Sequence, residues 1–97
     1  MAEFALVVAV VPPPGFGVSK QCLAMELARA GPFLDLTAEW STDGETDSIR
    51  VSGRVGAPDV FIAARLIEEA LPSALRSCHV ARDAPVVELA LTRLPNS

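Results

Sequence analysis

Residues 3–11 read EFALVVAVV, and this apolar run decides the fold. In an extended chain successive side chains point to opposite sides, so the run presents two faces. A strand with two apolar faces is typical of the interior of a sheet, and we expect residues 3–11 to form a central strand. The two faces consist of Phe4, Leu6, Val8 and Val10 on one side and Ala5, Val7, Ala9 and Val11 on the other.

A helix is predicted after this strand. Three prolines at 12–14 end the strand because proline has no N–H for the ladder, and Ser19 is a preferred N-cap residue. The helix is expected to run to about Ala30, where Gly31 and Pro32 stop it. On a helical wheel, the stripe expected to be buried contains Leu23, Leu27 and Ala30. The side expected to face solvent contains Cys22 and Met25.

Two alternating runs, around residues 33–40 and 49–55, predict a hairpin. Gly44 and Glu45 are the expected central residues of its turn, with glycine first as in a type II′ turn. One face of this hairpin is predicted to be apolar. It consists of Leu34, Leu36, Ala38 and Trp40 from the first run and Ile49, Val51 and Val55 from the second. On the polar face, this register sets three cross-strand pairs, Glu39 with Arg50, Thr37 with Ser52 and Asp35 with Arg54.

The rest of the sequence predicts a second helix and a last strand. The helix is expected from about Pro58-Asp59 to Leu71, and the strand over residues 85–94. The residues expected to face the core are Val60, Ala63, Leu66, Ile67 and Ala70 in the helix and Val87, Leu89 and Leu91 in the strand.

The resulting order, β-α-β-β-α-β, is that of the ferredoxin-like split β-α-β fold in the α+β class. We expect a single domain over residues 1–97, with a four-stranded antiparallel sheet ordered 4-1-3-2 and two helices on one face. This order places the first strand in the interior, as its two apolar faces require. It also leaves the second face of the sheet open.

The composition excludes several partners. Twelve acidic against eight basic residues give a formal net charge of −4, so we expect no nucleic-acid partner. No apolar stretch approaches the roughly 18 residues that span a bilayer, and no membrane partner is expected. Glu3 stands where a signal peptide would carry a basic residue, so we predict a cytoplasmic protein with Cys22 and Cys78 reduced.

No residue pattern predicts an enzyme, a cofactor or a metal site. Cys78 and His79 are adjacent, and neighbours on an extended chain point apart, which places them poorly for acid–base catalysis. Asp43, Glu45 and Asp47 lack the spacing of a calcium loop and fit a solvated hairpin tip. RNA-recognition modules share this topology but stack bases on aromatic residues, and the third predicted strand has none.

The loop PPPGFGVSK at residues 12–20 is the candidate ligand site. It opens a helix, so free backbone N–H groups and the positive end of the helix dipole meet there. It is not a P-loop, because Lys20 does not follow a glycine. The alternative interpretation is therefore a small-ligand sensing module for an anion or an amino acid, with Gly15, Gly17, Ser19 and Lys20 at the site.

The open face of the sheet is the main candidate site. Because the first strand is apolar on both sides, whichever set faces away from the helices stays uncovered, unless residues 76–84 fold across it. An uncovered apolar patch usually marks an interface. We expect a non-enzymatic interaction or assembly module that binds a protein partner or forms a homodimer. The interface candidates are Val7, Val8, Val10, Val86 and Ala90.

Overall fold

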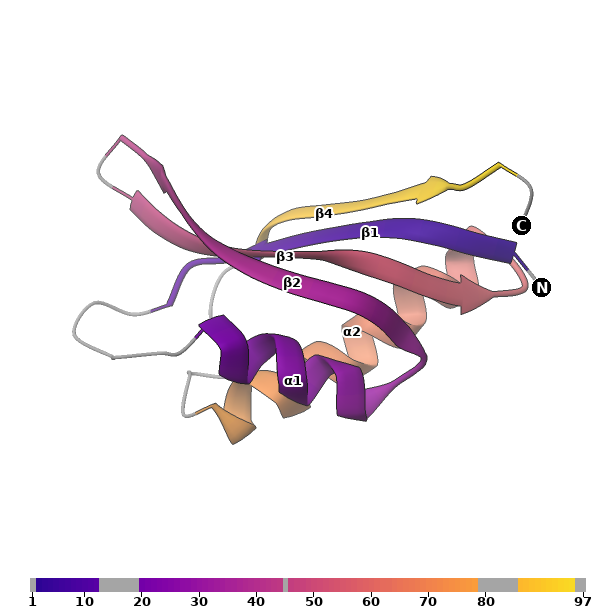
Figure 1. Ribbon diagram of the computed structural model, residues 1–97, viewed down its shortest axis with the longest axis horizontal. Coiled ribbons are helices and arrows are strands. Elements are labelled where there is room, and N and C mark those ends of the chain that lie inside the picture. Colours follow the sequence, from indigo (N-terminus) through magenta and orange to yellow (C-terminus); the bar gives the residue numbers. More distant parts are fainter. Residues whose placement is uncertain (1, 13–19, 45, 79–85, 96–97) are drawn as a thin grey trace.

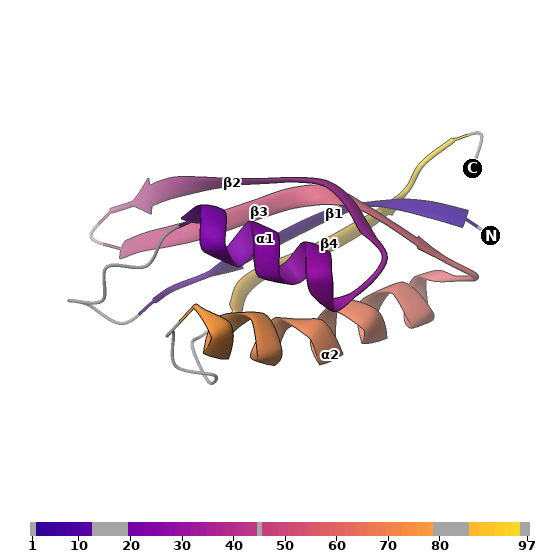
Figure 2. The same cartoon turned by 60° about the horizontal axis from the view of Figure 1, so that its bottom comes forward.

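The chain forms a four-stranded antiparallel sheet with two helices on one of its faces (Figure 1). The computed structural model describes residues 2–12, 20–44, 46–78 and 86–95. The strand order β2-β3-β1-β4 confirms the predicted order, and Figure 2 shows both helices below the sheet. The elements are β1 (Ala2–Val10), α1 (Lys20–Ala30), β2 (Phe33–Asp43), β3 (Thr46–Ala57), α2 (Val60–Ser77) and β4 (Val86–Arg93).

β1 lies in the interior of the sheet between β3 and β4, as its sequence predicts. Its larger side chains turn toward the helices, where burying each one contributes roughly 1.5–3 kcal/mol. The smaller set, with Ala5 and Val7 half-buried, occupies the face without helices. The buried set, at most 3% exposed, is Phe4, Leu6, Val8 and Val10.

α1 packs onto the sheet through Leu23 and Leu27, which are both fully buried. Ala30, expected in the same stripe, is exposed. Cys22 packs against the core, contrary to the wheel, and forms a disulfide with Cys78 at the end of α2. The prediction of two reduced cysteines is therefore wrong. The two helices run side by side and bring the Cα atoms to 6.0 Å, within disulfide range, across a sequence separation of 56.

The hairpin of β2 and β3 has the predicted turn and most of the predicted register. Asp43 pairs with Thr46 around the turn, and Gly44 has a φ of 66°, in the left-handed region that glycine tolerates. Glu39 lies opposite Arg50, as predicted. Further along, Thr37 lies opposite Ser52, and Trp40 lies opposite Ile49 on the other face.

A bulge in β2 corrects the predicted position of Asp35. The register shifts between Leu34 and Thr37, so Arg54 lies opposite Leu34. Asp35 has a φ of 55°, which an aspartate tolerates better than most residues. The bulge turns Leu34 out to 52% exposure and places Phe33 in the core at 5%, the reverse of the alternation expected from the sequence.

α2 begins where the sequence predicts and continues farther. Asp59 is the N-cap, and its side chain accepts a hydrogen bond from the backbone N–H of Ile62 at 2.9 Å. The helix passes through Pro72, where a stop was expected, and ends at Ser77. Beyond the proline, Ala74 and Leu75 are 1% exposed, and their burial offsets the backbone hydrogen bond that proline cannot make. Val60, expected to be buried, is 40% exposed.

β4 is the edge strand beside β1. Leu89 and Leu91 lie opposite Val8 and Leu6, on the helix side as predicted, whereas Val87, expected to face the core, lies at a register shift and is 60% exposed. The register shifts between Ala9 and Val10 of β1, and Val86 lies opposite Val10. The shift therefore turns Val86 toward the helix side, although the sequence placed it on the open face.

Candidate interaction surface

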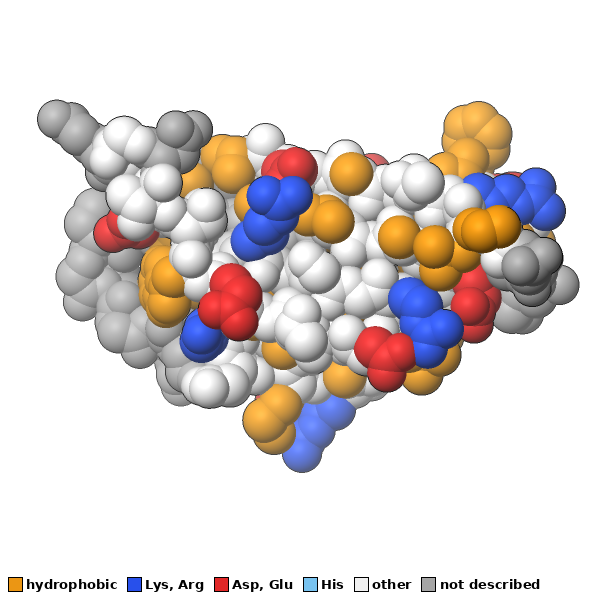
Figure 3. All heavy atoms as spheres, turned by 45° about the horizontal axis from the view of Figure 1, so that its top comes forward, with side chains coloured by type: hydrophobic (Ala, Val, Ile, Leu, Met, Phe, Trp, Pro, Cys, Tyr) orange, Lys and Arg blue, Asp and Glu red, His pale blue; other side chains and the backbone are white. Residues whose placement is uncertain are grey.

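The open face of the sheet carries mostly small and polar side chains rather than a continuous apolar patch (Figure 3). In its middle, Val7 of β1 lies between Ser52 of β3 and Ala90 of β4. Ala9 is only 4% exposed. This face therefore offers less apolar area than the sequence predicted.

Ion pairs cross the open face. Arg54 donates from Nε to Oδ2 of Asp35 at 3.0 Å, and its Nη1 lies 3.3 Å from Oε2 of Glu3. The hydrogen bond to Asp35 raises the pKa of Arg54, and the charges of Asp35 and Glu3 add to the effect. Arg50 Nη2 lies 3.4 Å from Oε1 of Glu88. The expected ion pair of Asp35 with Arg54 thus forms although the two residues are not directly opposite each other, and these charges are compensated within the chain.

The five interface candidates do not share one surface. Val8 and Val10 are 1% exposed and lie under the helices, so they are not part of the open face. Val86 lies at the helix side of the sheet edge. Val7 and Ala90 do lie on the open face and pair with each other across β1 and β4.

At the candidate ligand loop, Lys20 is engaged within the chain. Its Nζ lies 3.1 Å from Oε2 of Glu39 on β2, so the charge considered for an anion is bound to a carboxylate. Glu39 therefore forms its ion pair with Lys20 and not with Arg50, which the sequence predicted as its partner. Gly15, Gly17 and Ser19 lie outside the described residues.

Within the described residues, no group of three or more His, Cys, Asp or Glu side chains is placed to hold a metal ion. Asp47 accepts a hydrogen bond from the Thr42 hydroxyl at 2.8 Å, as fits a hairpin tip. His79 and Glu45 lie outside the described part of the chain, as do residues 79–84, which the sequence left free to cover the open face. No helix in the described segments is long and apolar enough to cross a membrane.

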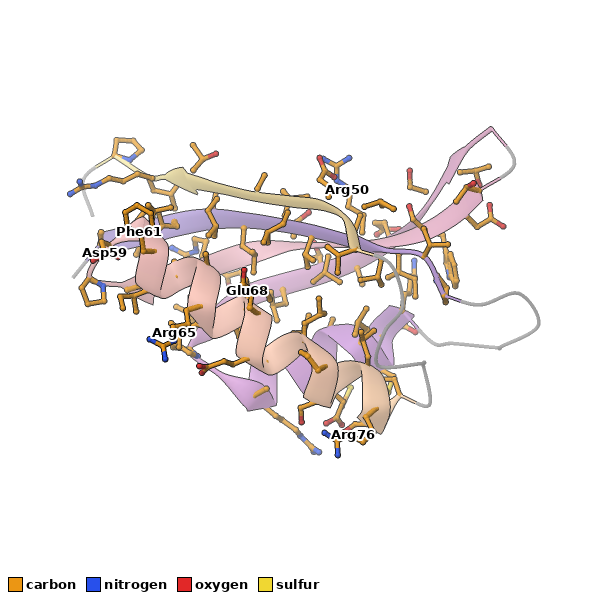
Figure 4. All side chains as sticks on the ribbon, turned by 180° about the vertical axis from the view of Figure 1, so that it is seen from behind. Arg50, Asp59, Phe61, Arg65, Glu68 and Arg76 are labelled. Atoms are coloured by element: carbon orange, nitrogen blue, oxygen red, sulfur yellow. A yellow bond between two sulfur atoms is a disulfide. The ribbon has the colours of Figure 1, made fainter. Side chains whose placement is uncertain are left out.

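Large apolar side chains gather instead around the β4 edge and the start of α2. Val86, Val87 and Leu89 of β4 are 47%, 60% and 42% exposed. Phe61, in the first turn of α2, is 81% exposed. Figure 4 views the molecule from this side, with β4 along the top and Phe61 on the helix below it. We call this the β4 surface: residues 86–93 together with the side of α2 that carries Phe61 and Glu68.

An apolar groove of about 280 Å³ separates α2 from β4 in this surface. Its floor includes Val8 of β1, and Glu68 is the charged residue that lines it. Figure 4 shows Glu68 pointing from α2 toward the sheet, whereas Arg65 and Arg76 point away. The apolar walls are Ile67, Leu71, Pro72 and Leu75 of α2 and Val86 and Leu89 of β4.

Sequence reasoning missed the β4 surface, although one signal pointed to it. Phe61 stands four residues before Arg65 and seven before Glu68, which places an aromatic residue on the charged side of the amphipathic helix. The groove gave no such signal. It depends on how far α2 lies from β4, and the sequence does not specify that separation.

These features define a small α+β protein with one sheet face covered by two helices and a group of exposed apolar side chains near the β4 edge. No protein family model, no curated protein and no solved structure matches this chain. Its function is therefore inferred from the geometry of the β4 surface.

Proposed function

We propose that this protein is a non-enzymatic assembly module that associates with a second copy of itself through the β4 surface. We also propose that it belongs to the ferredoxin-like group of folds, which its β-α-β-β-α-β order and β2-β3-β1-β4 sheet support. The observation that carries the functional proposal is an edge strand with exposed apolar side chains beside an apolar groove.

The backbone of β4 is the first support for association. β4 pairs with β1 on one side only, and the sheet ends there. An edge strand presents a row of N–H and C=O groups to another chain, and natural proteins block such edges with lysine, proline or bulges when they must stay monomeric. β4, with the sequence VVELALTR, contains no lysine or proline, and its register shift lies at its first residues, between Val86 and Glu88.

The side chains are the second support. Val86 and Leu89 are exposed and line the groove, and exposed apolar surface of this kind marks interaction sites. β4 carries one acidic and one basic residue, Glu88 and Arg93, so two copies of it do not repel each other by net charge. The open face, where Val7 is half-buried among small and ion-paired residues, supports a docking role less well.

The Cys22–Cys78 disulfide bears on the location of the protein. Disulfides persist in oxidising compartments and are rare in the cytosol. The bond therefore favours an oxidising compartment over the cytoplasm expected from the sequence. Alkylation of free thiols in intact cells before lysis tests this location. Labelling of both cysteines would show that they are reduced and would support a cytoplasmic location instead.

Sedimentation at concentrations from micromolar to millimolar tests self-association. Wild-type protein is expected to form dimers, and Val87→Lys is expected to abolish them, because a lysine on an edge strand opposes pairing. Met25→Lys on α1 is a matched control, since Met25 is 58% exposed and Val87 is 60% exposed. A wild-type protein that stays monomeric throughout, or a Val87→Lys variant that dimerises like Met25→Lys, overturns the proposal.

A further inference from the structure

Two copies of the chain can dimerise in one particular orientation. The positions of the β4 edge, the groove and Phe61 specify it. Resting on the proposed function, we propose that the second copy aligns its β4 antiparallel to β4 about a two-fold axis at Ala90, joining the sheets into one. In the same dimer, Phe61 of each copy enters the α2–β4 groove of the other. The partner is thus a second copy of this chain, held in one register.

The two faces of β4 restrict the register to axes that pass through a residue. A two-fold axis perpendicular to the sheet keeps each residue on its own face, so residues of like face must lie opposite each other. An axis at Ala90 sets Leu89 opposite Leu91 of the second copy on the helix side. Moving the axis to Glu88 would instead place two carboxylates opposite each other, which is unfavourable.

The charges of the β4 surface support a second copy as the occupant. Among the ion pairs of the described residues, neither Glu68 nor Arg93 takes part. Arg93 lies opposite Phe4 on the helix side of β4, and Glu68 lines the groove. The two-fold axis at Ala90 brings the Arg93 end of one β4 beside the Val86 end of the other, where the groove opens. Each copy therefore presents both members of a complementary pair.

Phe61 and the groove supply a second complementary pair. The start of α2 lies near Arg93, because Val60 and Arg93 line the same hollow, whereas Leu75 lies near Val86. The two-fold axis reverses the direction of α2, so Phe61 of one copy faces the Leu71–Leu75 end of the other helix. A buried aromatic side chain in an apolar pocket is the usual energetic centre of an interface.

A stable interface area requires both the pairing of the β4 edges and the contact of Phe61 with the groove. A stable dimer buries roughly 800 Å² per partner. The strand edge is eight residues long and needs the adjoining groove and helix side to reach that area. Occupation of the groove by Phe61 also covers an aromatic side chain that is otherwise 81% exposed.

Cross-linking tests the register. Residues opposite each other in antiparallel strands have Cα atoms about 4.5–5.5 Å apart, which suits a disulfide. Ala90→Cys is expected to form a covalent dimer under mild oxidation, and Thr92→Cys, also exposed on β4, is not, because the axis sets Thr92 opposite Glu88. Peptide mapping of the product confirms that Cys22 and Cys78 stay joined.

Binding of variants tests the side-chain contacts. Phe61→Ala is expected to raise the dimer dissociation constant at least about tenfold, with an unchanged circular dichroism spectrum because the side chain is exposed. Glu68→Arg and Arg93→Glu are each expected to weaken the dimer, and the double variant to restore it. Val60→Ala, also in the first turn of α2, is the control for Phe61.

The outcomes separate this inference from the proposed function. A dimer that cross-links through Thr92→Cys and not Ala90→Cys overturns the register while self-association stands. A dimer whose affinity is unchanged by Phe61→Ala and by both charge reversals overturns the groove contact. A protein that is monomeric at every concentration overturns the proposed function and this inference together.

Discussion

The two edge strands of the sheet differ in how the helices pack beside them. β2 contains a bulge and a left-handed residue at Asp35, its side chains form ion pairs with Lys20 and Arg54, and α1 packs beside it. β4 has a register shift near its start and an ion pair of Glu88 with Arg50, and a groove separates it from α2. Bulges and charges are the features by which natural sheets prevent edge-to-edge pairing. The comparison teaches that the two edges differ most in helix packing, because α1 lies beside β2 whereas the groove leaves β4 open on the side of α2.

The largest expected effect contrasts packing near the two edges. Leu27 of α1 is 0% exposed, so Leu27→Ala should lower the free energy of unfolding by about 2–5 kcal/mol. Leu89 of β4 is 42% exposed at the groove, and Leu89→Ala should cost less than about 1 kcal/mol. Urea denaturation in the Val87→Lys background, where dimerisation is expected to be absent, measures both. Equal losses would show that β4 is packed as closely as the β2 side.

An intermediate effect is expected at the bulge that protects β2. A Cβ added at Gly53 would lie 2.5 Å from Cδ2 of Leu36 and 2.8 Å from the carbonyl oxygen of Leu34. Gly53→Ala should therefore cost about 1–3 kcal/mol in stability, as overpacking does. Ser52→Ala, one residue away on the other face, is the control in the same thermal or urea unfolding experiment. If the glycine variant loses no more stability than the control, the bulge is not packed over Gly53.

The smallest effect is expected on the open face. Val7→Glu should raise the dimer dissociation constant less than Phe61→Ala does, because Val7 adjoins the β4 surface only through its cross-strand neighbour Ala90. Sedimentation measures the constant, and circular dichroism confirms that the variant is folded. A folded Val7→Glu protein that no longer dimerises would move the docking surface back to the open face predicted from the sequence.

Much of the fold could be predicted because its signals are local. The period of apolar residues identified the elements, and the Gly44-Glu45 turn fixed Glu39 opposite Arg50. The bulge at Asp35 could not be predicted from alternation, since it depends on Leu36 lying over Gly53 in the neighbouring strand. α2 continues through Pro72 because Ala74 and Leu75 find a buried position there, which local propensity does not contain.

The candidate site was less predictable than the fold. The sequence indicated that β1 is apolar on both faces, and it did not indicate which face the helices would cover. The helices cover the face with larger side chains, which removed Val8 and Val10 from the predicted interface. Phe61 was visible as an aromatic residue on a charged helix side, but its relation to the groove depends on the position of α2 beneath the sheet.

The sequence by itself determined the types of the elements, their order and the interior position of β1, because these depend on side-chain periodicity and turn residues close together in the chain. Only the tertiary structure decided three features: the joining of Cys22 to Cys78, the turning of Val86 to the helix side and the separation of β4 from α2. Each depends on the distance between segments far apart in sequence. Such distances are set by how the side chains of both segments fill the space between them.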